Sequence, residues 1–211
     1  MTGPEPDRVR DPERTRGLIL EAAVAEFAEN GLSGARVDAI AARAGANKRM
    51  LYHYFGNKED LYLAALEHVY VAIRSRERAL HLEDLPPALA MRELVLVTWR
   101  HFIEHPEFLS LLVTENLHRA RYIRKSQLVR ELHSPLVEMI GTILDRGARS
   151  GVLRAGVDPV QLYISIASLG WFYLSNRFTL GTIFDQDLES EAALAARAEH
   201  IVEVIMGYLR P

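Results

Sequence analysis

Strand signals are nearly absent from this sequence, and that absence constrains the fold more than any other feature. No alternating run of β-branched residues is bounded by hairpin turns. Apolar residues recur instead at helical spacing. Ile19, Ala23 and Phe27 stand four apart, and would form one stripe on a helix that begins near Asp11. The sequence therefore predicts an all-α chain of about nine helices.

Three helices, of which the second and third are short, are expected in the first 57 residues. Asn30-Gly31 should end the first, because both residues tolerate a left-handed backbone. A second helix is expected from Val37 to Ala44, with Gly45 ending it. A third covers Asn47 to Tyr54, and Asn47 can cap its free N–H groups. Gly56-Asn57 then breaks the chain again.

Six further helices are predicted beyond this break, most of them opened by proline, serine or acidic residues. Their expected ranges are about 58–80, 87–104, 106–117, 135–147, 159–180 and 191–209. The segment 119–130 is ambiguous, and part of it is expected to be a loop.

Composition excludes several kinds of function. The chain of 211 residues has no cysteine, so disulfides, thiolate catalysis and cysteine-bound zinc are excluded. Its N-terminus contains no apolar run of the secretory type. The uncharged run 159–176 is shorter than the roughly 20 residues of a membrane span, so we expect a buried helix there. The sequence predicts a cytoplasmic protein with no membrane partner.

The two short helices 37–44 and 47–54, separated by a glycine turn and with the first helix packing behind them, match the requirements of a helix-turn-helix. In this motif the second of the two short helices enters the DNA major groove. Apolar residues such as Ile40 and Leu51 can hold the helices together while polar neighbours point outward. Between Arg36 and Lys58 there are five basic residues and one acidic residue, although the whole chain has a net charge of −3. The predicted DNA-binding residues are Arg36, Asn47, Lys48, Arg49, Met50, Tyr52, His53 and Lys58.

The chemistry of these side chains suggests a division of roles. Arg49 can read a guanine edge, and Lys48 can do so or bind phosphate. Tyr52, His53 and Lys58 suit phosphate contacts, which position a protein without specifying a sequence. Two short helices and a charged turn also occur in many helical bundles, so spacing alone leaves both interpretations open.

The segments RTRGLILEAAVAEFAENG and VDAIAARAGANKRMLYHYFGNKEDL resemble the N-terminal domain of the TetR family of bacterial transcription regulators. The resemblance implies a homodimeric repressor or activator that binds a palindromic operator and responds to a small-molecule effector. It implies a helix-turn-helix DNA-binding domain (11–57) and a ligand-binding and dimerisation domain (58–211), while the prolines, glycine and mixed charges of residues 1–10 predict a flexible arm. The stretches PEFLSLLVTENLHRARYI and RFTLGTIF more weakly resemble the subgroup that includes repressors of pyrimidine breakdown.

Two departures from the family pattern concern the DNA-binding helices. Ala35-Arg36 stand where family members usually have a Thr or Ser pair, so a hydroxyl contact to phosphate is in doubt. Residues 47–50 replace the serine and small residues that commonly begin the recognition helix. This more basic edge predicts a different operator sequence.

The C-terminal half offers aromatic walls and polar anchors for an effector pocket. The predicted ligand-binding residues are Trp99, Phe102, Glu115, Asn116, Arg119, Tyr122, Trp171, Phe172 and Asn176. Each of these is also compatible with ordinary packing or a solvated surface. The helix 159–180 and an apolar stripe on the last helix predict the dimer interface, or alternatively the core of a monomer.

Other chemistries find little support in the sequence. His101 and His105 share a helix face, and Glu104 and His118 stand as further ligand candidates, but we predict no metal site and no cofactor. No nucleophile elbow, phosphate loop or H-E-x-x-H motif is present, so no enzyme is predicted. The alternative to a DNA-binding regulator is a helical small-molecule carrier or interaction module that does not bind DNA.

Overall fold

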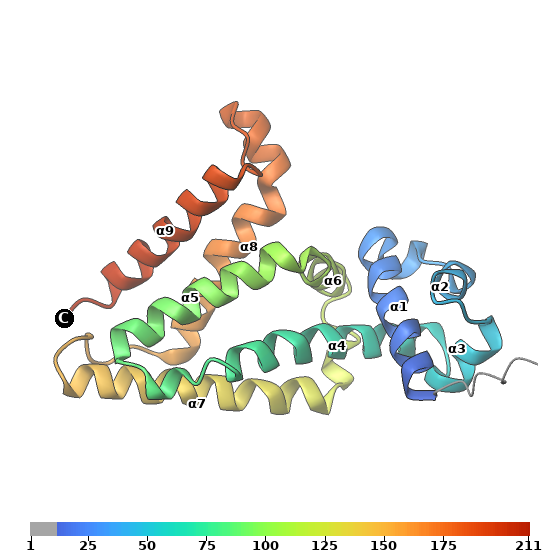
Figure 1. Cartoon of the computed structure of the whole chain (residues 1–211), viewed down its shortest axis with the longest axis horizontal. Helices are drawn as coiled ribbons and strands as arrows, with labels where there is room; N and C mark the ends of the chain where they lie inside the picture. The colour runs from blue at the N-terminus through green and yellow to red at the C-terminus, as the bar shows by residue number, and fades with distance from the viewer. Residues whose placement is uncertain (1–11) are drawn as a thin grey trace, which may run out of the picture. The chain divides into compact units, whose positions relative to one another are not determined.

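Three helices open the described part of the chain in this computed structural model, which describes residues 12–211 apart from the side chain of Ser134 (Figure 1). α1 spans Pro12–Gly34, α2 Val37–Arg43 and α3 Lys48–Phe55. The expected stop at Asn30-Gly31 is a kink inside α1, where Gly31 has a left-handed φ of 64°. The predicted arm at residues 1–10 lies outside the described residues.

Six further α-helices complete residues 12–211, so the prediction of an all-α fold with about nine helices is confirmed. No strand occurs in this range. The helices are α4 (Lys58–Arg78), α5 (Pro87–Glu104), α6 (Pro106–Leu117), α7 (Gln127–Arg149), α8 (Pro159–Phe184) and α9 (Glu191–Tyr208). Two short 3₁₀ turns, η1 (Leu82–Asp84) and η2 (Ile123–Lys125), lie between them.

The predicted start of α7 near Ser134-Pro135 is wrong. Ser126 caps the helix by accepting a hydrogen bond from the Val129 N–H, so α7 begins at Gln127 and Pro135 lies inside it. Burial of Val129, Leu132 and further residues along one side continues the helix through the proline. Packing therefore outweighs the lost hydrogen bond that normally makes an interior proline a helix breaker.

The predicted end of α8 before Gly181 is also wrong, since the helix continues to Phe184. Gly181 accepts a hydrogen bond from the Gln186 N–H across 3.0 Å, and Asp185 ends the helix with a left-handed φ of 51°. A Cβ at Gly181 would lie 2.9 Å from the Gln186 carbonyl oxygen. Gly181 thus allows the chain after α8 to fold back onto the helix, and the helix does not end at this glycine.

The described residues form two compact units that do not follow the predicted boundary at 57/58. The head unit comprises residues up to 68 together with 110–125, and the body unit comprises 69–109 and 126–211. α4 and α6 therefore each contribute residues to both units. A functional boundary at residue 57/58 stays a prediction.

Aromatic rings at the centre of the head unit tie its later segment to its first helices. Tyr62 meets the edges of Phe27 and Tyr122 at ring-centroid distances of 5.1 and 5.3 Å. Its hydroxyl donates to the Leu111 carbonyl. Residues 110–125 are therefore part of the same core as α1 and the start of α4.

α5 occupies the centre of the body unit and packs against α7, α8 and α9. The close approach of α8 depends on Gly170, where a Cβ would lie 3.2 Å from the Phe102 ring and 3.3 Å from that of Trp99. No helix within residues 12–211 is both long and apolar enough to span a membrane.

Candidate DNA interface and effector cavity

The third helix has one buried and one exposed side. Leu51 and Phe55, four residues apart, are only 2% and 8% exposed and hold α3 in the head unit. Asn47 caps the helix, because its side-chain oxygen accepts a hydrogen bond from the Met50 N–H across 3.0 Å. The cap predicted for Asn47 is therefore confirmed. This cap fixes which residues of α3 face outward.

Arg49, Tyr52 and His53 are exposed on α3, and Met50 is half-buried. The side chains of Arg49 and Tyr52 make no hydrogen bond or ion pair with other residues in the range 12–211, and the His53 ring meets the edge of the Tyr54 ring. These side chains are available to an external partner. Their contact with DNA stays a prediction.

The other predicted DNA-binding residues already have partners within the head unit. Lys48 Nζ lies 3.3 Å from Asp38 Oδ1 on α2, and Lys58 Nζ donates to the Ser33 carbonyl at 3.4 Å. The backbone N–H of Arg36 donates to Glu26 at 3.0 Å, while its side chain is exposed. Binding of DNA phosphates by Lys48 or Lys58 would have to compete with these weak surface contacts.

Contacts between helices fix α2 and α3 within the head unit. Arg43 donates to both carboxylate oxygens of Glu29 on α1, at 3.0 and 2.9 Å. This interaction raises the pKa of Arg43 and lowers that of Glu29, chiefly through the side-chain hydrogen bonds. The Arg16 guanidinium on α1 lies over the Phe55 ring at 5.2 Å. Arg43, one of the five basic residues of this region, is thus occupied in the protein.

Four of the predicted ligand-binding residues belong to the head unit, where they shape a turn. The Glu115 carboxylate is buried and accepts the N–H groups of Tyr122 and Ile123 at 2.8 and 2.9 Å. Tyr122 is itself buried, and burial raises the pKa of its hydroxyl. Asn116 donates to the carbonyl of Leu112, and Arg119 is exposed with a left-handed φ of 56°. Glu115 thus holds the backbone of this segment.

The remaining five predicted ligand-binding residues belong to the body unit, but they do not converge on one cavity. Trp99 and Phe102 are buried on α5, whereas Phe172 is exposed on α8. Trp171 is half-buried, and Asn176 donates to the carbonyl of Phe172 in its own helix. Among these five, Phe102 alone lines the cavity described next.

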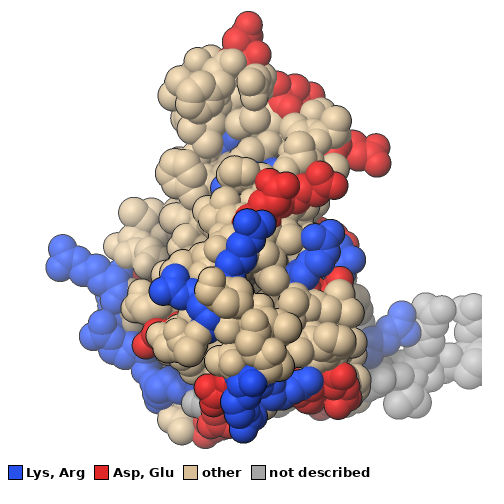
Figure 2. Space-filling model, turned by 90° about the vertical axis from the view of Figure 1, so that its left-hand side faces the viewer, with Lys and Arg blue, Asp and Glu red and all other residues tan. Residues whose placement is uncertain are grey.

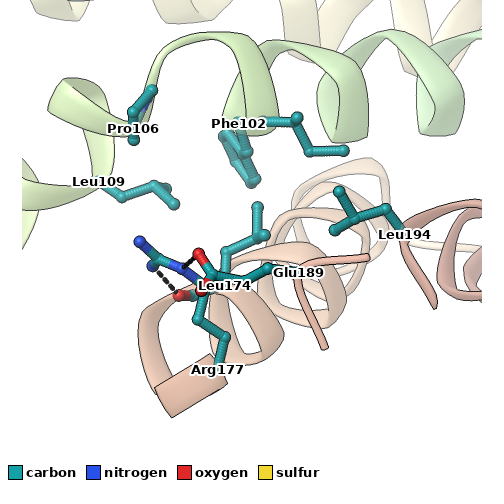
Figure 3. Close-up of a pocket in the computed structure, with 8 residues that line it drawn as sticks. Phe102, Pro106, Leu109, Leu174, Arg177, Glu189 and Leu194 are labelled. Atoms are coloured by element: carbon teal, nitrogen blue, oxygen red, sulfur yellow. Dashed lines mark hydrogen bonds and ion pairs between the residues drawn. The ribbon is translucent and has the colours of Figure 1, made fainter. Parts of the chain in front are cut away.

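An open cavity of about 210 Å³ lies in the body unit (Figure 3). Its polar edge is the pair Arg177 and Glu189, whose Nε and Oε1 atoms are 2.8 Å apart. Arg177 also donates to the Leu174 carbonyl at 2.5 Å. The lining is otherwise apolar, and consists of Phe102, Ile103, Pro106, Leu109, Leu174 and Leu194. Arg177 and Glu189 were not among the predicted ligand-binding residues, because their pairing depends on the turn that follows α8.

The histidines considered as metal ligands do not form a cluster. The His101 and His105 rings are adjacent, with centroids 4.6 Å apart, and His105 Nδ1 lies 3.0 Å from Glu107. Glu104 pairs with Arg76, and His118 belongs to the other unit. Within residues 12–211 no group of three or more potential ligands is placed to hold a metal ion.

Apolar side chains are exposed along α8 and α9 of the body unit. On α8 these include Val160, Ile164 and Phe172, and on α9 Val204 and Tyr208. Figure 2 shows a broad uncharged surface on the upper part of this face, with acidic side chains gathered near its top. The stripe expected on the last helix is different, because Ile201, Val202, Ile205 and Leu209 are buried in the chain's own core.

Comparisons with known proteins agree in pointing to one family. The family model described as "Bacterial regulatory proteins, tetR family" matches residues 19–65, and the model described as "Tetracyclin repressor-like, C-terminal domain" matches residues 87–205. The HTH-type transcriptional repressor NicS of Pseudomonas putida is 39% identical over 203 residues, which are 96% of each chain.

Two further relatives also match nearly the whole chain. The HTH-type transcriptional regulator RutR of Escherichia coli K12 is 26% identical over 204 residues, covering 97% of this chain and 94% of its own. The crystal structure of SCO4942 from Streptomyces coelicolor has a TM-score of 0.70 at 26% identity and covers 93% of this chain and 99% of that one.

Proposed function

Because the chain belongs to the TetR family of bacterial regulatory proteins, we propose that it binds a palindromic operator as a homodimer and is released by a small-molecule effector. The chain is a ligand-responsive transcriptional regulator, and the relatives described above are regulators, not enzymes. Repression is the favoured sign of regulation, because NicS is named as a repressor.

The observation that carries this proposal is the division of α3 into two sides. Leu51 and Phe55 bury one side, and the exposed side presents a cation and two polar rings. A recognition helix requires this arrangement, since it must be anchored from behind while its outer side chains reach base edges. Residues 11–57 act as the DNA-binding domain, and residues 58–211 carry effector binding and dimerisation.

Arg49 is the base-reading residue in this proposal. Its guanidinium is exposed and has no partner among residues 12–211, so binding a guanine would break no existing contact. Tyr52 and His53 lie on the same exposed side and bind phosphates, as do Arg36, Lys48 and Lys58. Asn47 and Met50 set the edge of the helix that selects the operator.

The exposed apolar side chains of α8 and α9 form the homodimer interface. A monomer would leave Ile164 half exposed and Phe172 more than half exposed, at 50% and 55%. Pairing of the same two helices from each protomer buries these residues in a symmetric four-helix arrangement. The palindromic operator then matches the two-fold symmetry of the protein.

Effector release acts through α4, a single helix whose first residues belong to the head unit and whose last residues belong to the body unit. An effector bound in the body changes the orientation of α4 and therefore the spacing of the two recognition helices. A coupling free energy of about 1–3 kcal/mol changes operator affinity about 5- to 150-fold.

The DNA proposal is tested by selecting sequences from a random duplex library and measuring binding by fluorescence anisotropy at several salt concentrations. Arg49→Ala should cost about 1–3 kcal/mol and relax the preference at one base position. Arg92→Ala, which removes an exposed arginine from α5, should leave binding unchanged. A uniform loss for all sequences would assign Arg49 to a phosphate, and the absence of salt-sensitive specific binding would favour a carrier without DNA binding.

The dimer proposal is tested by sedimentation velocity on Ile164→Glu. Two charges placed in a symmetric apolar interface repel each other and are costly to desolvate, so the variant should be monomeric. Val152→Glu is the matched control, because Val152 is similarly exposed but lies between α7 and α8. A dimeric Ile164→Glu variant would place the interface elsewhere.

A further inference from the structure

A charged pair is buried inside the body unit. Arg74 and Glu77 on α4 are each only 2% exposed. Arg74 Nη1 donates to Glu77 Oε2 at 2.5 Å, and Arg74 Nη2 donates to the Tyr163 hydroxyl on α8 at 2.5 Å. The guanidinium also lies over the Tyr163 ring, 5.1 Å from its centroid. This cluster shares no residue with the open cavity at Arg177.

Several polar atoms in this region have no hydrogen-bond partner among residues 12–211. They are Arg74 Nε, Glu77 Oε1 and both ring nitrogens of His101 on α5, whose side chain is also 2% exposed. Each such atom destabilises the folded state when it is buried without a partner. Native proteins keep few of these atoms, and a group of them commonly marks a place where another molecule supplies the missing bonds.

Aromatic rings from several helices contact one another beside His101. The Phe108 ring meets His101 edge-on at 5.6 Å and Tyr70 at 5.4 Å. Tyr70 in turn meets the His133 ring on α7 at 5.4 Å. Rings from several helices therefore offer edges and faces to a planar molecule.

Arg74 is the principal cation of the cluster at neutral pH. Burial lowers the pKa of His101 to about 4, with the charges of His105, Arg76 and Arg74 acting in the same direction. Burial also lowers the pKa of His133, and Arg74 contributes to that shift. Both histidines are therefore uncharged. Burial raises the pKa of Glu77 to about 7, and the charge of Arg74 acts in the opposite direction.

We propose that Arg74 anchors the carboxylate of the effector, and that the effector is a small aromatic monocarboxylate held between Arg74, Tyr163 and His101. The Nε and Nη2 atoms of Arg74 form the planar fork that binds a carboxylate with two parallel hydrogen bonds. Tyr163 and His101 complete the hydrogen bonding, and the surrounding rings pack against the aromatic ring. This inference rests on the proposed function and names the chemical class of its effector.

The arginine at the open cavity is less suited to this role. Arg177 Nε is bonded to Glu189 and its Nη1 to the Leu174 carbonyl. Its side chain is 26% exposed, so water competes for it. Arg177 therefore serves as the control for Arg74.

The first experiment measures thermal stabilisation of the full chain by three acid and amide pairs: benzoate with benzamide, phenylacetate with phenylacetamide, and acetate with acetamide. The two aromatic acids should raise Tm in a concentration-dependent manner, acetate less, and the amides not at all. The proposal is overturned if no acid raises Tm, or if each amide stabilises the protein as well as its acid does.

The second experiment measures benzoate affinity by calorimetry in variants. Arg74→Lys retains the charge but loses the fork, and the double variant Arg74→Met, Glu77→Gln removes both buried charges together. Each should bind benzoate at least about tenfold more weakly, the loss expected for charge-assisted hydrogen bonds. Arg177→Met should bind it normally. The inference is wrong if both Arg74 variants keep wild-type affinity, or if Arg177→Met alone loses it.

A third measurement separates this inference from the proposed function. The quantity compared is the ratio of operator affinities with and without benzoate, measured separately for each protein. This ratio should fall for wild type and change much less for Arg74→Lys. If wild type binds benzoate through Arg74 but binds no DNA, the carboxylate-binding role of Arg74 is supported and the regulator proposal fails. If wild type binds DNA but does not bind benzoate, the carboxylate-binding role of Arg74 is wrong and the regulator proposal is supported.

Discussion

Arg49 and Arg74 carry the same side chain in opposite settings. Arg49 projects from α3 without a partner in the described chain, while Arg74 is buried between a carboxylate and a tyrosine hydroxyl. The contrast shows two ways to prepare a cation for a ligand. The Arg49 side chain on the head unit is exposed to water, whereas the Arg74 side chain in the body unit is held by its hydrogen bonds to Glu77 and Tyr163. Exposed charges of the first kind are screened by salt, and buried ones much less.

The largest expected effect tests the division of α3 into two sides. Leu51→Ala should destabilise the head unit by about 2–5 kcal/mol, because it removes a buried side chain and leaves a cavity. Tyr52→Ala, at the next position, should change stability by less than about 0.5 kcal/mol, because Tyr52 is 43% exposed. Denaturant unfolding measures both variants, and anisotropy should show that Tyr52→Ala weakens DNA binding. Equal destabilisation would contradict the orientation of α3.

An intermediate effect is expected for the pH dependence of folding stability, which tests the burial of Glu77 and His101. Glu77 holds its proton more tightly in the folded state, so its contribution to stability falls as pH rises from about 4.5 to about 7. His101 holds its proton less tightly there, so its contribution falls as pH drops from about 6.5 to about 4. The two slopes oppose each other between about pH 4.5 and 6.5.

Two variants should separate these slopes. Glu77→Gln should lose stability on acidification relative to wild type, and His101→Phe should gain it, each by at most about 1.4 kcal/mol per pH unit. Denaturant unfolding at half-unit pH steps measures the differences, and contributions from surface carboxylates cancel in the comparison. Parallel curves for all three proteins would mean that neither group titrates abnormally.

The smallest effect concerns the surface of the head unit. Asp38→Asn removes the acidic partner of Lys48 and should tighten DNA binding a few-fold at low salt, because it releases a cation and removes a negative charge. Stability should change by less than about 1 kcal/mol, since the pair is largely exposed. Unchanged affinity would place Lys48 away from the phosphates. Glu138→Gln on α7 is the control for a general charge effect.

Local signals predicted most helix ends correctly. Asn47 and Ser190 cap their helices through hydrogen bonds made within three residues, so adjacent sequence suffices to find them. The start of α7 was predicted wrongly because the cap at Ser126 lies beside basic residues and Pro135 resembles a start signal. Whether a helix continues through proline depends on packing against other helices, which adjacent sequence does not encode.

The residues proposed to bind the effector were the least predictable part of the molecule. Trp99, Phe102 and Glu115 were all predicted to bind the effector. Trp99 and Phe102 are buried in the body unit, whereas Glu115 stabilises a turn in the head unit. Arg74 stands in an ordinary amphipathic pattern, and its burial follows from the packing of α4 against α8 through Tyr163. Helical periodicity places a residue on one side of its helix. It does not say which other helix covers that side.

The contribution of residues 110–125 to the head unit has a consequence for protein engineering. A fragment ending after His68 would lack Leu111 and Tyr122, which contact Tyr62, and would expose that ring to water. Grafting the operator specificity of this chain onto another scaffold therefore requires an insertion from the middle of the sequence as well as the N-terminal segment. A chimera joined only at the N-terminal boundary would inherit the recognition helix without the core that supports it.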